Sequence, residues 1–114
     1  MNYEKIQKEA YDANVSIVEA GLVLLTWGNA SVADHDAGVF AIKPSGVAYN
    51  DLTPDAMVIV DIASGKTVAG DLRPSSDTDT HAELYRSFDR PGAIAHTHSH
   101  YAVCYAQALR DIPA

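Results

Sequence analysis

Ala93-Ile94-Ala95-His96-Thr97-His98 places two histidines two residues apart within a short apolar run. Such a run predicts a β-strand, in which alternate residues face the same way, so His96 and His98 share one face of a sheet. Their Cα atoms would lie roughly 6 to 7 Å apart, which lets both imidazole rings reach one metal ion. The stretch therefore predicts a strand of the fold and half of a metal site.

The composition indicates one ordinary globular domain. The chain has 114 residues, of which 47% are hydrophobic and 20% are charged. A net charge of −7 argues against nucleic acid and anionic membranes as partners, although it does not exclude a small anionic substrate held in a local pocket. The only cysteine, Cys104, rules out an internal disulfide and fits a reducing compartment. Because no segment reads as a signal peptide or a membrane span, we expect a cytoplasmic protein.

The expected elements give a mixed α/β order, with helices around a sheet. Apolar residues at helical spacing predict a first helix that ends near Gly21, a left-handed cap. Further helices are expected from about Asp79 and after Ser99. Strands are predicted at residues 22–26, 39–43, 57–61, 66–69 and 93–98, with a hairpin turn at Ser64-Gly65 and a short helical turn at 53–55.

Three polar loops share one composition, and each follows or precedes an expected element. They are Gly28-Asn29-Ala30-Ser31, Ser45-Gly46 and Ser75-Ser76. Small residues let backbone N–H groups and hydroxyls approach an anion closely, which suits a phosphate group. Glycine, serine and asparagine are also common turn formers, so each loop taken alone has a purely structural explanation.

The remaining histidines and Asp77 have competing explanations. His100 has the same parity as the histidine pair but lies past the expected end of the strand, so it is a weaker metal candidate. His35 is expected in a solvent-exposed turn, and His81 is expected to be buried and hydrogen-bonded on the apolar face of its helix. Asp77, just before that helix, is either an N-terminal cap or an oxygen ligand to a metal. Spacing does not decide between the two.

Four separated motifs carry a family resemblance. They are Trp27-Gly28-Asn29-Ala30-Ser31, Lys43-Pro44-Ser45-Gly46, Pro74-Ser75-Ser76-Asp77-Thr78 and His96-Thr97-His98-Ser99. In this order and spacing the chain resembles the N-terminal half of the L-ribulose-5-phosphate 4-epimerase family, within the class II aldolase superfamily. The resemblance implies an α/β/α layered fold with a largely antiparallel central sheet. It also implies that residues 1–114 are the N-terminal part of a single domain, in a homotetramer with active sites between subunits.

The same resemblance implies the roles of the site residues. A divalent metal, usually zinc, would be held by Asp77, His96, His98 and a further histidine downstream. The donor types alone are also compatible with manganese or cobalt. The residues implied in binding the sugar phosphate are Gly28, Asn29, Lys43, Ser45, Gly46, Ser75 and Ser76.

The resemblance implies an isomerase that acts on a ketopentose phosphate. The expected reaction interconverts L-ribulose 5-phosphate and D-xylulose 5-phosphate, a step of L-arabinose catabolism, by metal-assisted cleavage and re-formation of one carbon–carbon bond. Aldolases of the superfamily typically carry glutamate at the position of Asp77, so the aspartate favours the epimerase. The alternatives are a class II sugar-phosphate aldolase and a non-catalytic module that binds a sugar phosphate or a metal.

The sequence stops at Ala114, about half way through the family domain. The third histidine ligand and the acid/base residues of the family, an aspartate and a tyrosine, have no counterpart here. We therefore expect these 114 residues alone to be inactive and to be a piece of an active enzyme.

Overall fold

The structure is a computed structural model, and it describes residues 2–114. The element order mixes helices and strands, as the sequence predicts. The helices are α1 (Glu4–Glu19), α2 (Thr78–Ser87) and α3 (His100–Gln107), with short 3-10 turns η1 (Tyr49–Asp51) and η2 (Pro54–Ala56). The strands are β1 (Asn29–Asp34), β2 (Val39–Ile42), β3 (Val58–Asp61), β4 (Thr67–Ala69) and β5 (Ala93–His96).

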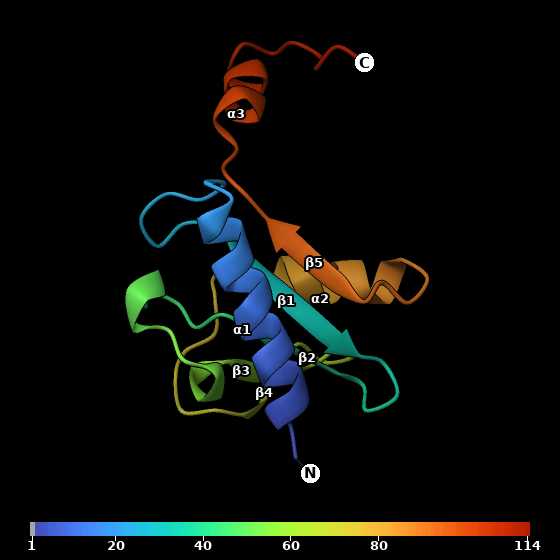
Figure 1. Ribbon diagram of the computed structural model, residues 1–114. Coiled ribbons are helices and arrows are strands. Elements are labelled where there is room, and N and C mark those ends of the chain that lie inside the picture. Colours follow the sequence, from blue (N-terminus) through green and yellow to red (C-terminus); the bar gives the residue numbers. More distant parts are fainter. Residues whose placement is uncertain (1) are drawn as a thin grey trace.

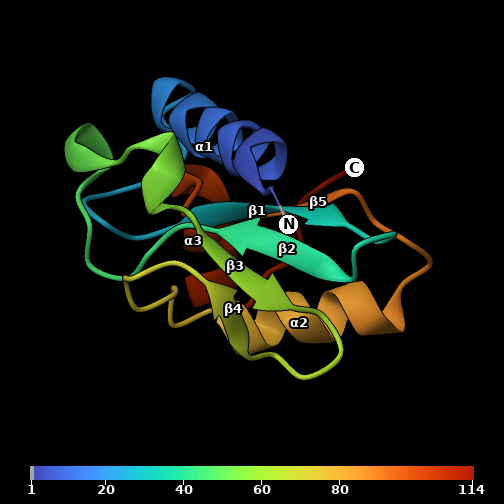
Figure 2. The same cartoon turned by 90° about the horizontal axis from the view of Figure 1, so that it is seen from below.

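The strands form a single antiparallel sheet between two helices. Its order is β4-β3-β2-β1-β5, so β5 lies beside β1 at one edge. Figure 1 shows α1 crossing in front of the sheet, and Figure 2 shows α2 on the opposite face. The α/β/α layering and the antiparallel sheet expected from the sequence are both confirmed.

Alternation along the central strands gives the sheet a core on each face. Val39 and Ala41 of β2 join the core under α1, whereas Phe40 and Ile42 join the core under α2. All four residues of β2 are buried, because both faces of the strand are covered. The sheet is therefore fixed from both sides, and the side chains at its strand ends are free to form a site.

The end of α1 follows the prediction, but the segment after it does not. Gly21 adopts φ +71°, its N–H donates to Val18 O, and the N–H of Leu22 donates to Ile17 O, the pairing typical of a glycine-capped helix end. The predicted strand at residues 22–26 is wrong, because these residues form a loop in which Leu24 and Leu25 are exposed. An apolar run without alternation was the only sign of that strand.

Asn14 links α1 to β1 at the point where β1 and β2 separate. Its side chain is fully buried, and its amide donates to Ala30 O at 2.9 Å and accepts from the Ala30 N–H at 2.9 Å. The β1–β2 pairing extends to Ser31 opposite Ile42 and goes no further. The Asn14 amide thus takes the place of a strand partner at Ala30, and the chain after β2 is free to diverge from β1.

Replacing Asn14 with leucine is expected to destabilise the fold by roughly 2–4 kcal/mol, because it leaves the buried N–H and C=O of Ala30 unpaired. Urea unfolding followed by circular dichroism measures the change. The matched control is Ser16→Ala on the exposed side of the same helix, which loses only the bond from Ser16 Oγ to Asp12 O. Equal stability of the two variants would contradict the role given to Asn14.

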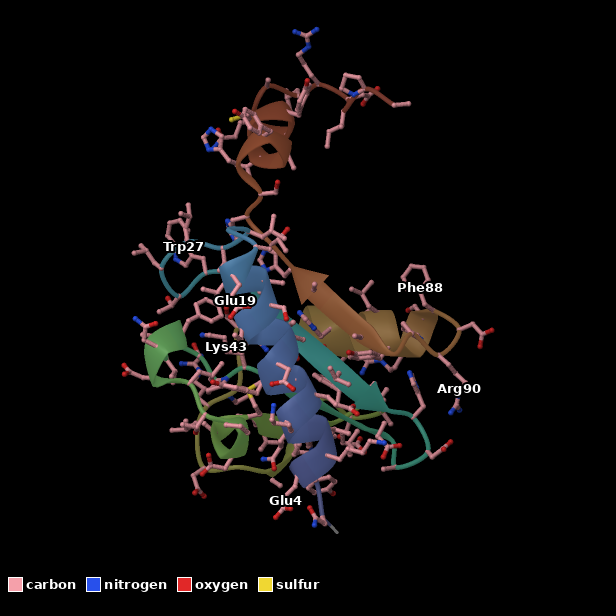
Figure 3. The ribbon with its side chains drawn as sticks, viewed as in Figure 1. Glu4, Glu19, Trp27, Lys43, Phe88 and Arg90 are labelled. Atoms are coloured by element: carbon pink, nitrogen blue, oxygen red, sulfur yellow. The ribbon has the colours of Figure 1, made fainter. Side chains whose placement is uncertain are left out.

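The C-terminal helix lies apart from the body of the molecule. No residue of α3 is buried, Leu109 just after it is 94% exposed, and Cys104 on the helix is a free, exposed thiol. Figure 1 shows α3 standing clear of the sheet, and Figure 3 shows Trp27 likewise projecting from the loop after α1.

Within residues 2–114, no helix combines the length and the apolar character needed to cross a membrane.

Candidate metal and sugar-phosphate site

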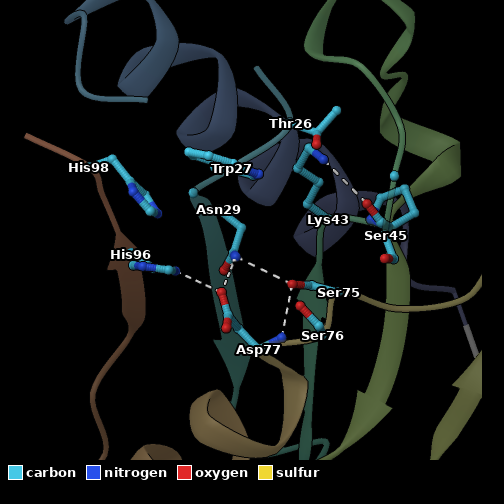
Figure 4. Close-up of a pocket in the computed structure, with 13 residues that line it drawn as sticks. Thr26, Trp27, Asn29, Lys43, Ser45, Ser75, Ser76, Asp77, His96 and His98 are labelled. Atoms are coloured by element: carbon cyan, nitrogen blue, oxygen red, sulfur yellow. Dashed lines mark hydrogen bonds and ion pairs between the residues drawn. The ribbon is translucent and has the colours of Figure 1, made fainter. Parts of the chain in front are cut away.

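A single cavity gathers every site residue predicted from the sequence. It has a volume of about 380 Å³ and opens where β1 begins and where β2 and β5 end, beside the N-terminus of α2. Figure 4 shows its side chains converging from these elements. The lining residues are Thr26, Trp27, Gly28, Asn29, Lys43, Pro44, Ser45, Gly46, Ser75, Ser76, Asp77, His96 and His98.

Asn29, Asp77 and His96 form one hydrogen-bonded chain on the floor of the cavity. Asn29 is the first residue of β1, not a loop residue as predicted, and it lies opposite His96 in the β1–β5 register. Its Nδ2 donates to Asp77 Oδ2 at 2.7 Å, and the same oxygen lies 2.6 Å from His96 Nδ1. The carboxylate therefore joins the ends of two neighbouring strands.

The structure argues against the capping role considered for Asp77. The residue occupies the N-cap position of α2, yet its side chain makes no capping hydrogen bond to the helix. Burial tends to raise the pKa of this carboxyl, but the hydrogen bonds from Asn29 and His96 hold the pKa below its ordinary value. Asp77 is thus an ionised carboxylate directed at the cavity.

The two histidines converge, although not on one strand as predicted. Strand β5 ends at His96, and the backbone N–H of His98 donates to Leu22 O in the loop after α1. Even so, the two imidazole centroids lie 4.9 Å apart, and the ring of Trp27 lies 5.7 Å from that of His98. His100, the weaker metal candidate of the sequence, begins α3 and does not line the cavity.

The donors match a divalent metal in kind but do not complete a site. Since Nδ1 of His96 is bonded to Asp77, Nε2 is the ring nitrogen left for a cation, an arrangement common around metal-binding histidines. Among residues 2–114, however, no three His, Cys, Asp or Glu side chains are arranged to hold an ion. Two imidazoles and one carboxylate suit zinc, manganese or cobalt and leave room for further ligands.

The opposite end of the cavity suits an anion. Lys43 is only 2% exposed, and its ammonium group lies 3.3 Å from Pro44 O and 5.0 Å from the centre of the Tyr49 ring. Burial lowers the pKa of Lys43, and within the described residues no carboxylate forms an ion pair with it. A buried ammonium group without a carboxylate partner favours an anionic ligand.

Asn29 also carries a buried hydrogen-bond acceptor that lacks a partner in the described residues. Its Nδ2 also lies 3.3 Å from Ser75 Oγ, whereas its Oδ1 is buried with no hydrogen-bond partner among residues 2–114. A buried acceptor of this kind is costly unless a donor reaches it. A hydroxyl group of a bound ligand would supply that donor.

Gly28 is required by close packing at the back of the cavity. It adopts φ +83°, and a Cβ placed on it would lie 2.5 Å from Val23 Cγ1 and 3.0 Å from His96 O. Tyr49 Oη donates to Gly28 O at 2.7 Å, and burial raises the pKa of this phenol to about 12. Gly28 therefore lets β1, β5 and the loop after α1 pack closely together.

The remaining histidines are structural. His81 is buried, as predicted, with Nδ1 2.7 Å from Ser31 Oγ, and burial lowers its pKa to about 4. The solvent-exposed position expected for His35 is wrong. The ring is half-buried, its Nε2 lies 2.7 Å from Pro91 O, and it packs edge-on against Tyr85.

Three lining residues were not among the predicted site residues. Pro44 and Trp27 lie inside two of the quoted motifs, so their motif positions were the available signal. Thr26 was assigned to a strand that does not exist, and its polar side chain at the end of an apolar run was the only sign of a different role.

The fold and this cavity define a class II aldolase-type domain, and the comparisons agree. The family described as "Class II Aldolase and Adducin N-terminal domain" matches residues 8–114. The chain belongs to this family.

Solved structures support the same assignment. An L-fuculose 1-phosphate aldolase is 32% identical with a TM-score of 0.90, and the match covers 100% of this chain and 53% of that one. The L-fuculose-1-phosphate aldolase of Thermus thermophilus is 26% identical with a TM-score of 0.71, over 94% of this chain and 52% of that one. YgbL of Escherichia coli, whose description names aldolase, epimerase and decarboxylase together, is 25% identical with a TM-score of 0.79, over 90% and 48%. The chain thus spans about half the length of these proteins.

Proposed function

We propose that this chain supplies the sugar-phosphate pocket and part of the metal site of a class II aldolase-type enzyme. The proposal depends on one observation. A single cavity combines the histidine pair and Asp77 with a buried Lys43 that forms no ion pair with a carboxylate of the described residues. The phosphate would bind at Lys43 and the serines, and the sugar carbonyl would face His96 and His98. The first candidate substrate is a ketose 1-phosphate, since the solved relative at 32% identity is an L-fuculose 1-phosphate aldolase.

The polar residues of the cavity would each have a part in that chemistry. His96 and His98, with Asp77, would hold a divalent metal, most simply zinc, which when bound stabilises negative charge on the substrate oxygens. Asp77, bonded to Nδ1 of His96, would hold the proton on that nitrogen and leave Nε2 as the ring nitrogen available to a cation. Asn29 Oδ1 accepts a substrate hydroxyl, while Lys43 and Ser75 fix the phosphate and thereby the reacting carbon atoms.

The 4-epimerase is a second candidate, favoured by one specific residue. Asp77 stands where aldolases of the superfamily typically carry glutamate, and its shorter side chain is already bonded to both Asn29 and His96. In this reading the enzyme holds the cleaved aldehyde phosphate and re-forms the bond with inverted configuration, and the substrate is L-ribulose 5-phosphate. The same residues serve both reactions up to bond cleavage.

The rest of the site would come from outside these 114 residues. Two imidazoles and one carboxylate leave a metal short of ligands, and the acid/base residues that the family resemblance implies have no counterpart among these residues. The solved relatives are about twice as long. We therefore propose that residues 1–114 are the N-terminal part of one domain, and that the complete enzyme is a homotetramer with its active sites between subunits.

A substrate panel tests the proposal. The protein that carries this sequence is incubated with zinc and either L-fuculose 1-phosphate or L-ribulose 5-phosphate. Release of an aldehyde from the first supports the aldolase, and formation of D-xylulose 5-phosphate from the second supports the epimerase. Lys43→Met is expected to raise KM for the active substrate at least tenfold, because it removes the buried ammonium group that would pair with the phosphate. Binding of either substrate without turnover would contradict both enzyme proposals.

A further inference from the structure

Side chains of helix α2 meet two successive residue pairs of the β1–β5 ladder, one at the edge of the cavity (the outer level) and one inside the molecule (the inner level). Asp77, His81 and Tyr85 follow one another at intervals of four and so lie on one face of the helix. On the sheet, Asn29 lies opposite His96, and two residues further along Ser31 lies opposite Ile94 on the same face. Asp77 meets the first pair at the edge of the cavity, while His81 and Tyr85 meet the second pair inside the molecule.

The inner level is a buried cluster of three polar side chains. Ser31 Oγ lies 2.7 Å from His81 Nδ1 and 2.7 Å from Tyr85 Oη. Ser31 is fully buried, and His81 and Tyr85 are 1% and 3% exposed. Burial raises the pKa of Tyr85 to about 12, against the lowering effect of its hydrogen bonds with Ser31 and with the backbone of Ile94, so its hydroxyl stays protonated and also contacts β5. One cluster thus ties α2 to both strands.

The outer level is much more open to solvent. The side chains of His96 and Asp77 are 44% and 33% exposed, and hydrogen-bonded pairs of this exposure contribute little to stability. The apolar contacts of α2, such as Phe40 with Tyr85, hold the helix against the sheet. They fix its position along and around its own axis only weakly, because apolar packing tolerates small shifts. Buried polar groups must keep their partners, so they specify one position of the helix.

We propose that Ser31, His81 and Tyr85 are positioning residues that set α2 on the sheet so that Asp77 lies between Asn29 and His96. None of the three lines the sugar-phosphate cavity, and they act through Asp77. The proposal deepens the proposed function, on which it rests for the use of His96 in holding a metal. Its structural content, the orientation of His96 by Asp77, exists without a metal.

The test uses the metal-free chain with ¹⁵N-labelled histidine. The nitrogen shifts report which ring nitrogen of His96 carries the proton in the neutral imidazole, and the bond to Asp77 predicts Nδ1. Ser31→Ala and Tyr85→Phe are expected to move His96 toward a mixture of the two tautomers. The matched control, Ala82→Gly, weakens a buried α2 position outside the cluster and should leave the tautomer unchanged. Zinc titrations of the same variants should show roughly a tenfold loss of affinity for Ser31→Ala and less than a twofold loss for the control.

The outcomes separate the two proposals. If both cluster variants keep the Nδ1 tautomer of the original chain, or if the control changes it equally, the positioning role is overturned. Should Ser31→Ala fail to fold, Tyr85→Phe, which keeps the aromatic ring, decides alone. A tautomer change in the variants, with no zinc bound even by the unsubstituted protein that carries this sequence, would uphold the positioning role and count against the proposed function.

Discussion

Replacing His96 with alanine is expected to lower the zinc affinity of the chain by at least tenfold. The substitution removes one of two imidazoles and also the partner of Asp77 Oδ2. Loss of a group that merely orients a ligand already costs about 10–100-fold in affinity, and loss of a ligand costs more. Calorimetric titration with zinc measures the effect.

Two further variants make the zinc result specific. His100→Ala is the matched control, because His100 begins the exposed helix α3 and lies outside the cavity. Asp77→Asn should lower zinc affinity as well, whether Asp77 binds the metal or orients His96. Unchanged affinity after His96→Ala would remove the histidine pair from the proposed site, and unchanged affinity after Asp77→Asn would return Asp77 to a purely local role at the start of α2.

Replacing Gly28 with alanine is expected to destabilise the fold by roughly 3 kcal/mol or more. A positive φ alone costs an alanine about 1–2 kcal/mol, and here the added Cβ would also overlap Val23 Cγ1 at 2.5 Å and press on His96 O at 3.0 Å. Because His96 O belongs to the backbone of β5, relief of the contact must shift the strand that carries His96. Thermal or urea unfolding gives the loss of stability.

The control separates strain from overlap. Gly38 has a similar φ of +71°, but a Cβ placed there would meet nothing within 4 Å, so Gly38→Ala should show the cost of the backbone conformation alone. We expect Gly28→Ala to be the more destabilising by about 2 kcal/mol. Equal losses would show that the loop after α1 yields easily and that the close approach at Gly28 has no consequence for the site.

The sequence was informative where residue chemistry and local spacing act together. The hairpin at Ser64-Gly65, the cap at Gly21 and the helix beginning near Asp79 depend on neighbouring residues, and all three are present. The convergence of ten predicted site residues in one cavity followed from the family resemblance, since no local pattern places Lys43 and His98 around the same cavity. Composition alone offered three loops with an ordinary explanation as turns.

The errors arose where tertiary contacts override local pattern. Residues 22–26 are apolar enough for a buried strand, yet the cap at Gly21 turns the chain into a loop and leaves Leu25 81% exposed. Asn29 is a strand residue because β5 pairs with it, a partner far away in the sequence. The role of Asn14 was missed altogether, since a polar residue on a helix gives no sign that its amide will replace a strand partner at Ala30.

The pairing of β1 with β5 also has a consequence for the order of events during folding. The hydrogen bond that joins Asn29 to Asp77 spans 48 positions of sequence, and the bonds from Ser31 to α2 span 50 and 54. Contacts of such long range form only after the entropy of closing a large loop has been overcome, which makes them slow compared with helices and hairpins. The β2–β3–β4 meander can assemble locally, whereas the cavity exists only once the last strand has docked. Ligand affinity in this chain is therefore a property of the completed fold and of no earlier intermediate.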